Sequence, residues 1–150
     1  MSAVAGGSDH ATIPADATVL EAARRMVDGA VGCLVVLDAK GRPCGILTDR
    51  DLSIRVVAEG RDPARTLVAK AMSAPLIAAR PGDPMDAILA RMEQHGIRRV
   101  PLVSDGVLVG VVRLDDLLLE FGRELADLGA AVTKARGKGR VRPAPRRRRG

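Results

Sequence analysis

Residues 32–52 read GCLVVLDAKGRPCGILTDRDL, and this stretch decides the fold. Gly32–Leu37 is an apolar run that is long enough for a buried strand and too short for a helix. The turn residues DAKG separate it from a second apolar run, PCGILT, so the two runs predict a β-hairpin. Thr48 or Asp49 then provides the N-cap of a helix that follows the second strand.

The same order of helix and strand patterns occurs a second time in the chain. A shift of 66 residues places DPMDAILARMEQHGIRRVPLVSDG on ATVLEAARRMVDGAVGCLVVLDAKG, and after a one-residue deletion VGVVRLDDL falls on CGILTDRDL. In the first copy, Asp16 or Thr18 is the expected N-cap of a helix before the hairpin, and Gly29 ends this helix. The expected elements of the second copy are a helix at 84–94, strands at 99–103 and 107–112, and a helix from Leu114 to about Leu128.

These patterns predict an α/β (α+β) fold made of two βαββα-type repeats. Each repeat is too small to bury a core alone, so we expect the two to pack sheet against sheet. The segment that joins them is broken by Pro63, Pro75, Pro81 and Pro84 and should form a short helix and a short strand. The predicted regions are a flexible N-terminus at 1–10, repeat 1 at 11–66, repeat 2 at 67–125 and a disordered basic tail at 130–150.

Charge is concentrated in that tail. Of the 24 basic residues, nine lie from Lys134 onward, where there is no acidic residue, so the rest of the chain has 15 basic and 18 acidic residues. Arg146, Arg147, Arg148 and Arg149 form a run that is typical of a disordered segment that binds nucleic acid or an acidic partner.

Composition argues against several classes of protein. The chain has one Phe and no Tyr or Trp, which disfavours an aromatic platform for single-stranded nucleic acid. Cys33 and Cys44 show no CxxC spacing, so we expect reduced, buried thiols and no metal site. The sequence has no apolar run of about 20 residues for a membrane span and no signal-peptide pattern, which favours a cytoplasmic protein. No catalytic motif such as HExxH or GxSxG is present, so we expect no enzyme.

The pair Thr48 and Asp51 is the first candidate for binding chemistry. At a helix start, unpaired N–H groups and the helix dipole favour an anion. The Thr48 hydroxyl can donate to a phosphate oxygen, and Asp51, one turn further, can accept from ribose hydroxyls. The alternative interpretation is a capping box with no ligand at all.

The chain resembles the CBS (cystathionine β-synthase) domain in tandem, a Bateman module, over roughly residues 11–122. The resemblance rests on DATVLEAARRM, GCLVVLDAKGRPCGILTDRDL, LVAKAMSAPLI and HGIRRVPLVSDGVLVGVVRLDDLL. It departs from the family in lacking a short helix before the first strand, and in having Arg113 where Thr or Ser is usual. The family resemblance implies a regulatory ligand, AMP, ADP, ATP or S-adenosylmethionine, in clefts between the copies, no required cofactor, and a disc-like homodimer.

The resemblance also implies that the motif of one copy works with the segment GIRRVP of the other. The expected ligand-binding residues are Ile46, Thr48, Asp51, Ile97, Arg98 and Arg99. Since Arg98 and Arg99 are neighbours in a strand, we expect only one of them to reach the cleft. The reciprocal cleft would use Val31, Gly32, Arg113 and Asp116, and it is expected to be degenerate because its motif brings no hydroxyl.

The sequence therefore predicts a regulatory module that binds an adenosine nucleotide or S-adenosylmethionine and signals the ligand state to a partner. The alternative prediction is a nucleic-acid-associated dimer that binds through its polybasic tail.

Overall fold

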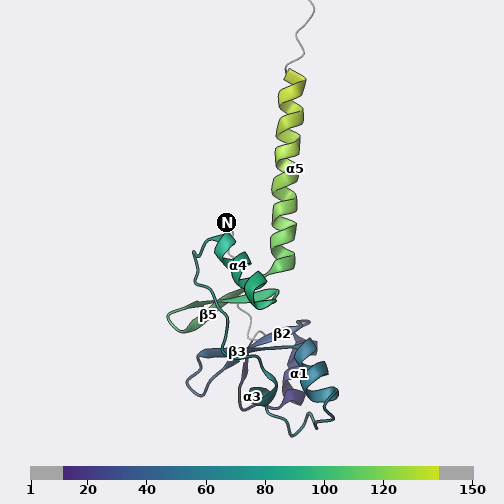
Figure 1. The fold of residues 1–150 in the computed structure, drawn as a ribbon, viewed down its shortest axis with the longest axis vertical. Helices are drawn as coiled ribbons and strands as arrows, with labels where there is room; N and C mark the ends of the chain where they lie inside the picture. The colour runs from purple at the N-terminus through teal and green to yellow at the C-terminus, as the bar shows by residue number, and fades with distance from the viewer. Residues whose placement is uncertain (1–11, 139–150) are drawn as a thin grey trace, which may run out of the picture. The chain divides into compact units, whose positions relative to one another are not determined.

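The computed structural model describes residues 12–138. The chain divides into two compact units, one up to Leu114 and one from Asp115 onward. In chain order the elements are β1 (Thr12–Pro14), α1 (Val19–Asp28), β2 (Cys33–Leu37), β3 (Pro43–Thr48), α2 (Asp49–Leu52), the π-helical turn η2 (Ser53–Val57), α3 (Val68–Ala71), α4 (Met85–His95), β4 (Arg99–Ser104), β5 (Val107–Arg113) and α5 (Leu114–Lys138) (Figure 1).

The first repeat contains a three-stranded sheet in the order β1-β2-β3. The predicted hairpin is confirmed: β2 and β3 pair antiparallel, with Cys33 opposite Thr48 at the open end. Strand β1 pairs parallel to β2 and is the first strand of the predicted βαββα pattern, but its bounds were not predicted, because a strand of three residues carries no readable alternation. Its Ile13 is buried and belongs to the core.

Helix α1 covers this sheet. Thr18 is its N-cap, as one of the two predicted candidates, and Val19, Ala22 and Met26 form its buried face. This spacing of three and four residues places the three side chains along one apolar stripe. The buried core of the repeat consists of Ile13, Val19, Ala22, Met26, Leu34, Val36, Leu47, Val56, Val68 and Ala71.

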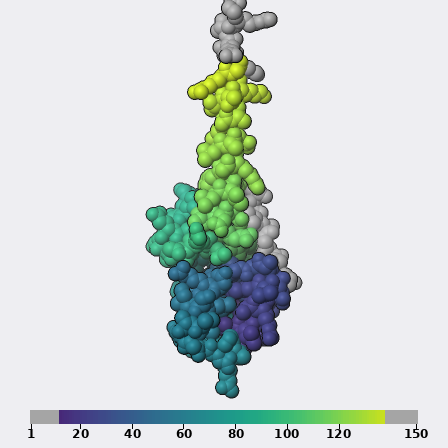
Figure 2. Space-filling model, turned by 90° about the vertical axis from the view of Figure 1, so that its right-hand side faces the viewer, coloured from purple at the N-terminus to yellow at the C-terminus, as the bar shows by residue number. Residues whose placement is uncertain are grey.

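The second repeat contains a two-stranded antiparallel sheet, β4-β5, in which Arg99 lies opposite Arg113. Helix α4 buries Ile88 and Met92 and ends at Gly96, whose φ of 62° is in the left-handed region that glycine adopts without strain. Figure 2 shows the purple-to-blue atoms of the first repeat in direct contact with the teal-to-green atoms of the second. As far as Leu114, both repeats belong to the first compact unit.

The linker between the repeats is attached to both. Its Val68 N–H donates to the Ala17 carbonyl, and Ile46 and Ser73 exchange backbone hydrogen bonds of 3.0 and 2.8 Å. Further on, Ala79 pairs with β4 through the backbone of Pro101 and Val103. The expected short helix is α3, whereas the expected short strand is reduced to isolated bridges.

Helix α5 is longer than predicted. It runs for 25 residues to Lys138, whereas the sequence indicated an end near Leu128. Residues 130–138, which the sequence assigned to the disordered tail, are helical, because alanine, lysine and arginine in this segment favour a helix. The rest of the tail and residues 1–10 lie outside the described residues. Among the described helices, none has the length and apolar character that crossing a membrane requires.

Candidate functional site

A cavity of about 510 Å³ lies where the end of β3, the linker and the segment before β4 meet. All six residues that the sequence assigned to ligand binding line this cavity. They are Ile46, Thr48 and Asp51 from the first repeat, and Ile97, Arg98 and Arg99 from the second. The structure thus brings together the two half-sites that the resemblance implied.

Six further residues line the cavity and were missed at the level of sequence. They are Asp49, Arg50, Ser73, Pro75, Ile77 and Gly96. Three of them belong to the linker, which reaches the cavity because Ser73 pairs with Ile46 on the edge of β3. The linker sequence LVAKAMSAPLI was part of the family resemblance, but its hydrogen-bonding partner could not be read from the sequence.

Thr48 and Asp51 form a complete capping box. Asp51 Oδ2 accepts from the Thr48 N–H at 2.9 Å and from the Thr48 hydroxyl at 2.8 Å, and Thr48 Oγ1 accepts from the Asp51 N–H at 3.2 Å. The Thr48 hydroxyl proton is therefore directed at Asp51 in this structure. Asp51 Oδ1 takes no part in the box and lies 3.7 Å from Nη2 of Arg55.

The backbone at this helix start differs from the expectation of unpaired N–H groups. The Asp49 N–H donates to the Gly32 carbonyl at 3.1 Å, and the Arg50 N–H donates to Asp49 Oδ1 at 2.8 Å. The Asp51 N–H is used by the capping box. An anion bound here would therefore have to be held by side chains.

Arg55 connects the capping box to the linker. Its Nη1 donates to the carbonyls of Ala71 and Met72 at 2.8 and 2.7 Å, and its Nη2 donates to the Ser73 hydroxyl at 3.1 Å. The same guanidinium forms the ion pair with Asp51. One side chain thus fixes the position of Asp51 and the path of the linker along the cavity.

Three arginines border the cavity, and the expectation that only one of Arg98 and Arg99 reaches it is wrong. Arg98 precedes β4 and lies in a bend, so the alternation of side chains along a strand does not apply to it. Arg50 is the third. Within residues 12–138, no ion pair is formed by any of these guanidinium groups. The lining also contains the carboxylates of Asp49 and Asp51, so its formal charge is +1.

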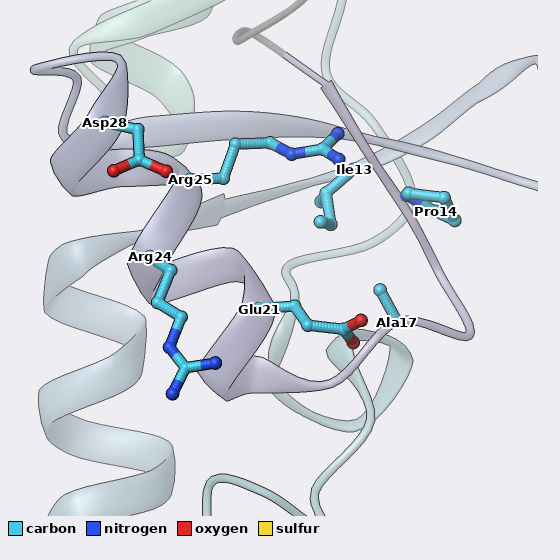
Figure 3. Close-up of a pocket in the computed structure, with 7 residues that line it drawn as sticks. All are labelled: Ile13, Pro14, Ala17, Glu21, Arg24, Arg25 and Asp28. Atoms are coloured by element: carbon cyan, nitrogen blue, oxygen red, sulfur yellow. The ribbon is translucent and has the colours of Figure 1, made fainter.

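A second cavity, of about 530 Å³, provides a useful contrast (Figure 3). It lies beside α1, where Thr18 and Glu21 form a capping box with the same pattern as Thr48 and Asp51. The hydrogen bond from the Thr18 backbone is the main cause of a lowered pKa of Glu21. Arg25 donates to the Thr12 carbonyl at 2.7 Å, and Figure 3 shows Arg24 directed away from Ile13. Glu21 and Arg25 here bind the helix start and β1, so a capping box alone does not identify a ligand site.

The reciprocal cleft remains a prediction. None of Val31, Gly32, Arg113 and Asp116 lines the Thr48–Arg99 cavity. A Cβ placed on Gly32 would lie 3.1 Å from Asp49 Oδ2 and 3.4 Å from Arg99 Nη2, so side chains already cover this glycine. Arg113 ends β5, whereas Asp116 belongs to the first turn of α5 in the other unit.

The other predictions from the sequence concern the two cysteines, a metal site and the arginine run of the tail. Cys33 and Cys44 are free thiols and are half-buried rather than fully buried. Within residues 12–138, no group of three or more His, Cys, Asp or Glu side chains is placed to hold a metal ion. The run Arg146–Arg149 lies outside the described residues.

Comparison with known proteins assigns the family. The CBS domain model matches residues 7–57 and 68–123. The chain is 39% identical over 124 residues to the CBS domain-containing protein YhcV of Bacillus subtilis, covering 82% of this chain and 86% of that protein. It is 36% identical over 102 residues to the uncharacterized protein MK0525 of Methanopyrus kandleri, covering 67% of this chain and 52% of that protein, so it spans about half of that relative.

A solved structure gives the same result. The putative signal-transduction protein with CBS domains from Burkholderia ambifaria superposes with a TM-score of 0.69 at 27% identity, covering 80% of this chain and 93% of that one. Two matches of one family model, in the two copies that the sequence and the fold both show, account for most of the body described above. The chain therefore belongs to the CBS domain family and carries two CBS domains in tandem.

Proposed function

We propose that this chain is a regulatory binding module, rather than an enzyme, whose ligand is an adenosine nucleotide bound in the Thr48–Arg99 cavity. The observation that carries the proposal is the convergence of a carboxylate, a hydroxyl and three arginines from both repeats on one cavity. Its volume of about 510 Å³ falls within the range of about 300–1,000 Å³ typical of small-molecule sites. The choice of an adenosine ligand comes from the family.

The arginines are suited to the phosphate groups. Guanidinium groups bind phosphate through paired N–H donors, and Arg50, Arg98 and Arg99 form no ion pair among the described residues that would compete. A phosphate held by Arg98 and Arg99 would neutralise the surplus positive charge of the lining. This balance favours AMP, ADP or ATP over S-adenosylmethionine, which brings a positive sulfonium.

Asp51 is suited to the ribose. The capping box uses Oδ2, and Oδ1 keeps lone pairs that face no hydrogen-bond donor at normal distance, because Arg55 Nη2 is 3.7 Å away. A ribose hydroxyl could donate to Oδ1 without breaking the box. The box would then orient the carboxylate in advance, which lowers the entropic cost of binding.

The apolar lining is suited to the base. Ile46 and Ile97 come from different repeats, and Pro75 and Ile77 come from the linker. With a single Phe in the chain, at position 121 in α5, aliphatic surfaces must take the role that aromatic rings have in other nucleotide sites. The base would be packed between the repeats, so its binding would stabilise their contact.

Arg55 offers a route from ligand to partner. A ribose on Asp51 Oδ1 would share this oxygen with Arg55, whose other bonds hold residues 71–73 of the linker. Ligand binding would therefore change the contacts of the segment that joins the two repeats. A partner that contacts the linker or the repeat interface could read this change.

The two capping boxes provide a matched test. Differential scanning calorimetry of the full chain is run with AMP, ADP, ATP and S-adenosylmethionine in turn. A ligand that binds only the native state, at about 100 times its Kd, adds about 2.7 kcal/mol of stability. Asp51→Ala should remove the ligand-induced rise in Tm, whereas Glu21→Ala, which breaks the equivalent box of α1, should keep it. A full rise in Asp51→Ala, or no rise with any of the four compounds, would contradict the proposal.

A further inference from the structure

Helix α5 carries a seam of exposed apolar side chains. Every residue from Phe121 to Gly137 is exposed. Large apolar side chains nevertheless recur at alternating intervals of three and four residues, which is the a and d pattern of a coiled coil. The seam consists of Leu118, Phe121, Leu125, Leu128, Val132 and Ala135, and the first five are between 41% and 68% exposed.

Packing against a partner would stabilise this helix. Gly122, Gly129 and Gly137 lie within it, and glycine is the least favourable residue after proline in a helix interior. In proteins, most of the stability of a helix comes from the packing of its apolar face rather than from its intrinsic helix propensity. In the space-filling view the helix is the green-to-yellow column (Figure 2). The side chains of the seam therefore have apolar surface available for another helix, and the glycines leave room for close approach.

The charges on α5 indicate that its partner helix is an antiparallel copy of α5. Residues 114–127 contain five acidic residues and one basic residue, whereas residues 128–137 contain Lys134 and Arg136 and no acidic residue. Two parallel copies would place acidic beside acidic and basic beside basic. Two antiparallel copies would place each acidic half beside a basic half, which is electrostatically favourable.

The seam is also self-complementary in the antiparallel direction. Read from either end, it has the same spacing of three, four, three, four and three residues. Antiparallel alignment therefore places Leu125 against Leu128 of the partner subunit and Phe121 against Val132 of the partner subunit. The antiparallel alignment that packs the apolar side chains against each other therefore also places the acidic half of one helix beside the basic half of the other.

We propose that two copies of this chain associate through an antiparallel coiled coil of their α5 helices, along the seam from Leu118 to Ala135. Most of this seam lies beyond residue 123, where the match to the CBS domain model ends. The proposal does not depend on nucleotide binding, so the two can fail separately.

The first test measures the mass of the full-length protein by sedimentation velocity. Leu125→Glu combined with Leu128→Glu places charges in the central layers and should reduce the mass of the assembly by half. The matched control, Ala126→Glu combined with Ala130→Glu, adds the same charges on the outer face of the same helix and should keep the wild-type mass. An unchanged mass in the seam variant, or an equal loss in the control, would overturn the proposal.

The second test uses charge reversal, which leaves the apolar residues intact. Glu120→Lys with Glu124→Lys, or Lys134→Glu with Arg136→Glu, should each weaken self-association by at least about tenfold at low salt. The variant with all four changes should associate as the wild type does, because opposite halves again face each other. If the fourfold variant is as weak as either double variant, or if no variant differs from the wild type, the antiparallel arrangement is excluded.

Discussion

Thr48 and Thr18 hold the same hydrogen-bonded box at the starts of two helices in one chain. In α1 the box closes on Glu21, and the neighbouring charged groups are used by the fold itself. At Thr48 the box closes on Asp51 beside a cavity that three arginines border. The difference between a cap and a candidate ligand site therefore comes from the surroundings of the box, since the hydrogen-bond pattern of the two boxes is the same.

Cys33 allows a prediction of pH dependence. Burial is the largest influence on its thiol and raises its pKa, while Arg99 and Arg113 oppose this and Asp49 adds to it. The thiol should therefore be protonated at neutral pH. In a Cys44→Ser background, reaction of Cys33 with a disulfide reagent should be slow at pH 7 and should still accelerate above about pH 8.5, the ordinary value for a thiol. A rate at pH 7 equal to that of free cysteine would contradict this.

The same shift has a consequence for stability. Because the folded-state pKa of Cys33 is raised, its contribution to the free energy of unfolding is complete below the ordinary thiol pKa. The contribution is lost as the pH rises from the ordinary value through the raised value, because over this range the unfolded chain releases the proton while the folded chain still holds it. The free energy of unfolding of Cys33→Ala, measured by chemical denaturation, should therefore fall less at alkaline pH than that of the wild type.

At the scale of elements, the linker is what completes the cavity. It pairs with the first repeat through Ser73 and with the second through Ala79, and it places Pro75 and Ile77 in the lining between these two points. Gly45 on β3 makes the first attachment possible. A Cβ at this position would lie 2.8 Å from both Met72 Sδ and the Ser73 carbonyl oxygen.

Gly45→Ala should therefore displace the linker from β3. We expect a loss of about 1–3 kcal/mol of stability, as for other overpacked sites, together with weaker nucleotide binding. Gly122→Ala is the matched control, because a Cβ there meets nothing within 4 Å and alanine favours the helix. Chemical denaturation and the ligand-induced rise in Tm are the measurements. A Gly45→Ala protein as stable as the wild type would show that the linker can adjust at no cost.

Arg55 is predicted to act as a positioning residue. Arg55→Ala removes three hydrogen bonds to the linker and the ion pair to Asp51, so we expect a loss of about 1–3 kcal/mol. Nucleotide affinity should fall as well, although Arg55 does not line the cavity. Arg55→Lys should recover part of the affinity, and Lys70→Ala, which removes an exposed charge from the same linker, should have no effect. Wild-type affinity in Arg55→Ala would contradict the role.

The sequence predicted the elements that have a clear period and a clear end. The strand Pro43–Thr48 and the helix capped by Thr18 are as predicted, because the turn DAKG and the cap are local signals. Strand β1 and the approach of the linker depend on partners that are distant in the sequence. The position of Arg98 was mispredicted because strand β4 begins one residue later than the alternation argument required.

At the scale of the whole molecule, the two repeats have similar architecture but differ at the open ends of their hairpins. Each repeat contributes one hairpin, and the open ends carry Cys33 opposite Thr48 in the first and Arg99 opposite Arg113 in the second. The two ends lie close together, because Arg99 Nη2 is 3.4 Å from the position that a Cβ on Gly32 would take. The first hairpin has a hydroxyl at this position and the second has only guanidinium groups, so the two hairpin ends differ in chemistry.

The central claim is a single nucleotide site that needs both repeats. Isothermal titration calorimetry of the full chain with AMP or ATP tests it most directly. The variant Asp51→Ala alters the half of the site from the first repeat, and the double variant Arg98→Ala/Arg99→Ala alters the half from the second repeat. The account predicts one site per chain in the wild type and a loss of affinity of at least about tenfold in both variants, because each removes charge-assisted hydrogen bonds. Two equivalent sites per chain, or wild-type affinity in either variant, would contradict it.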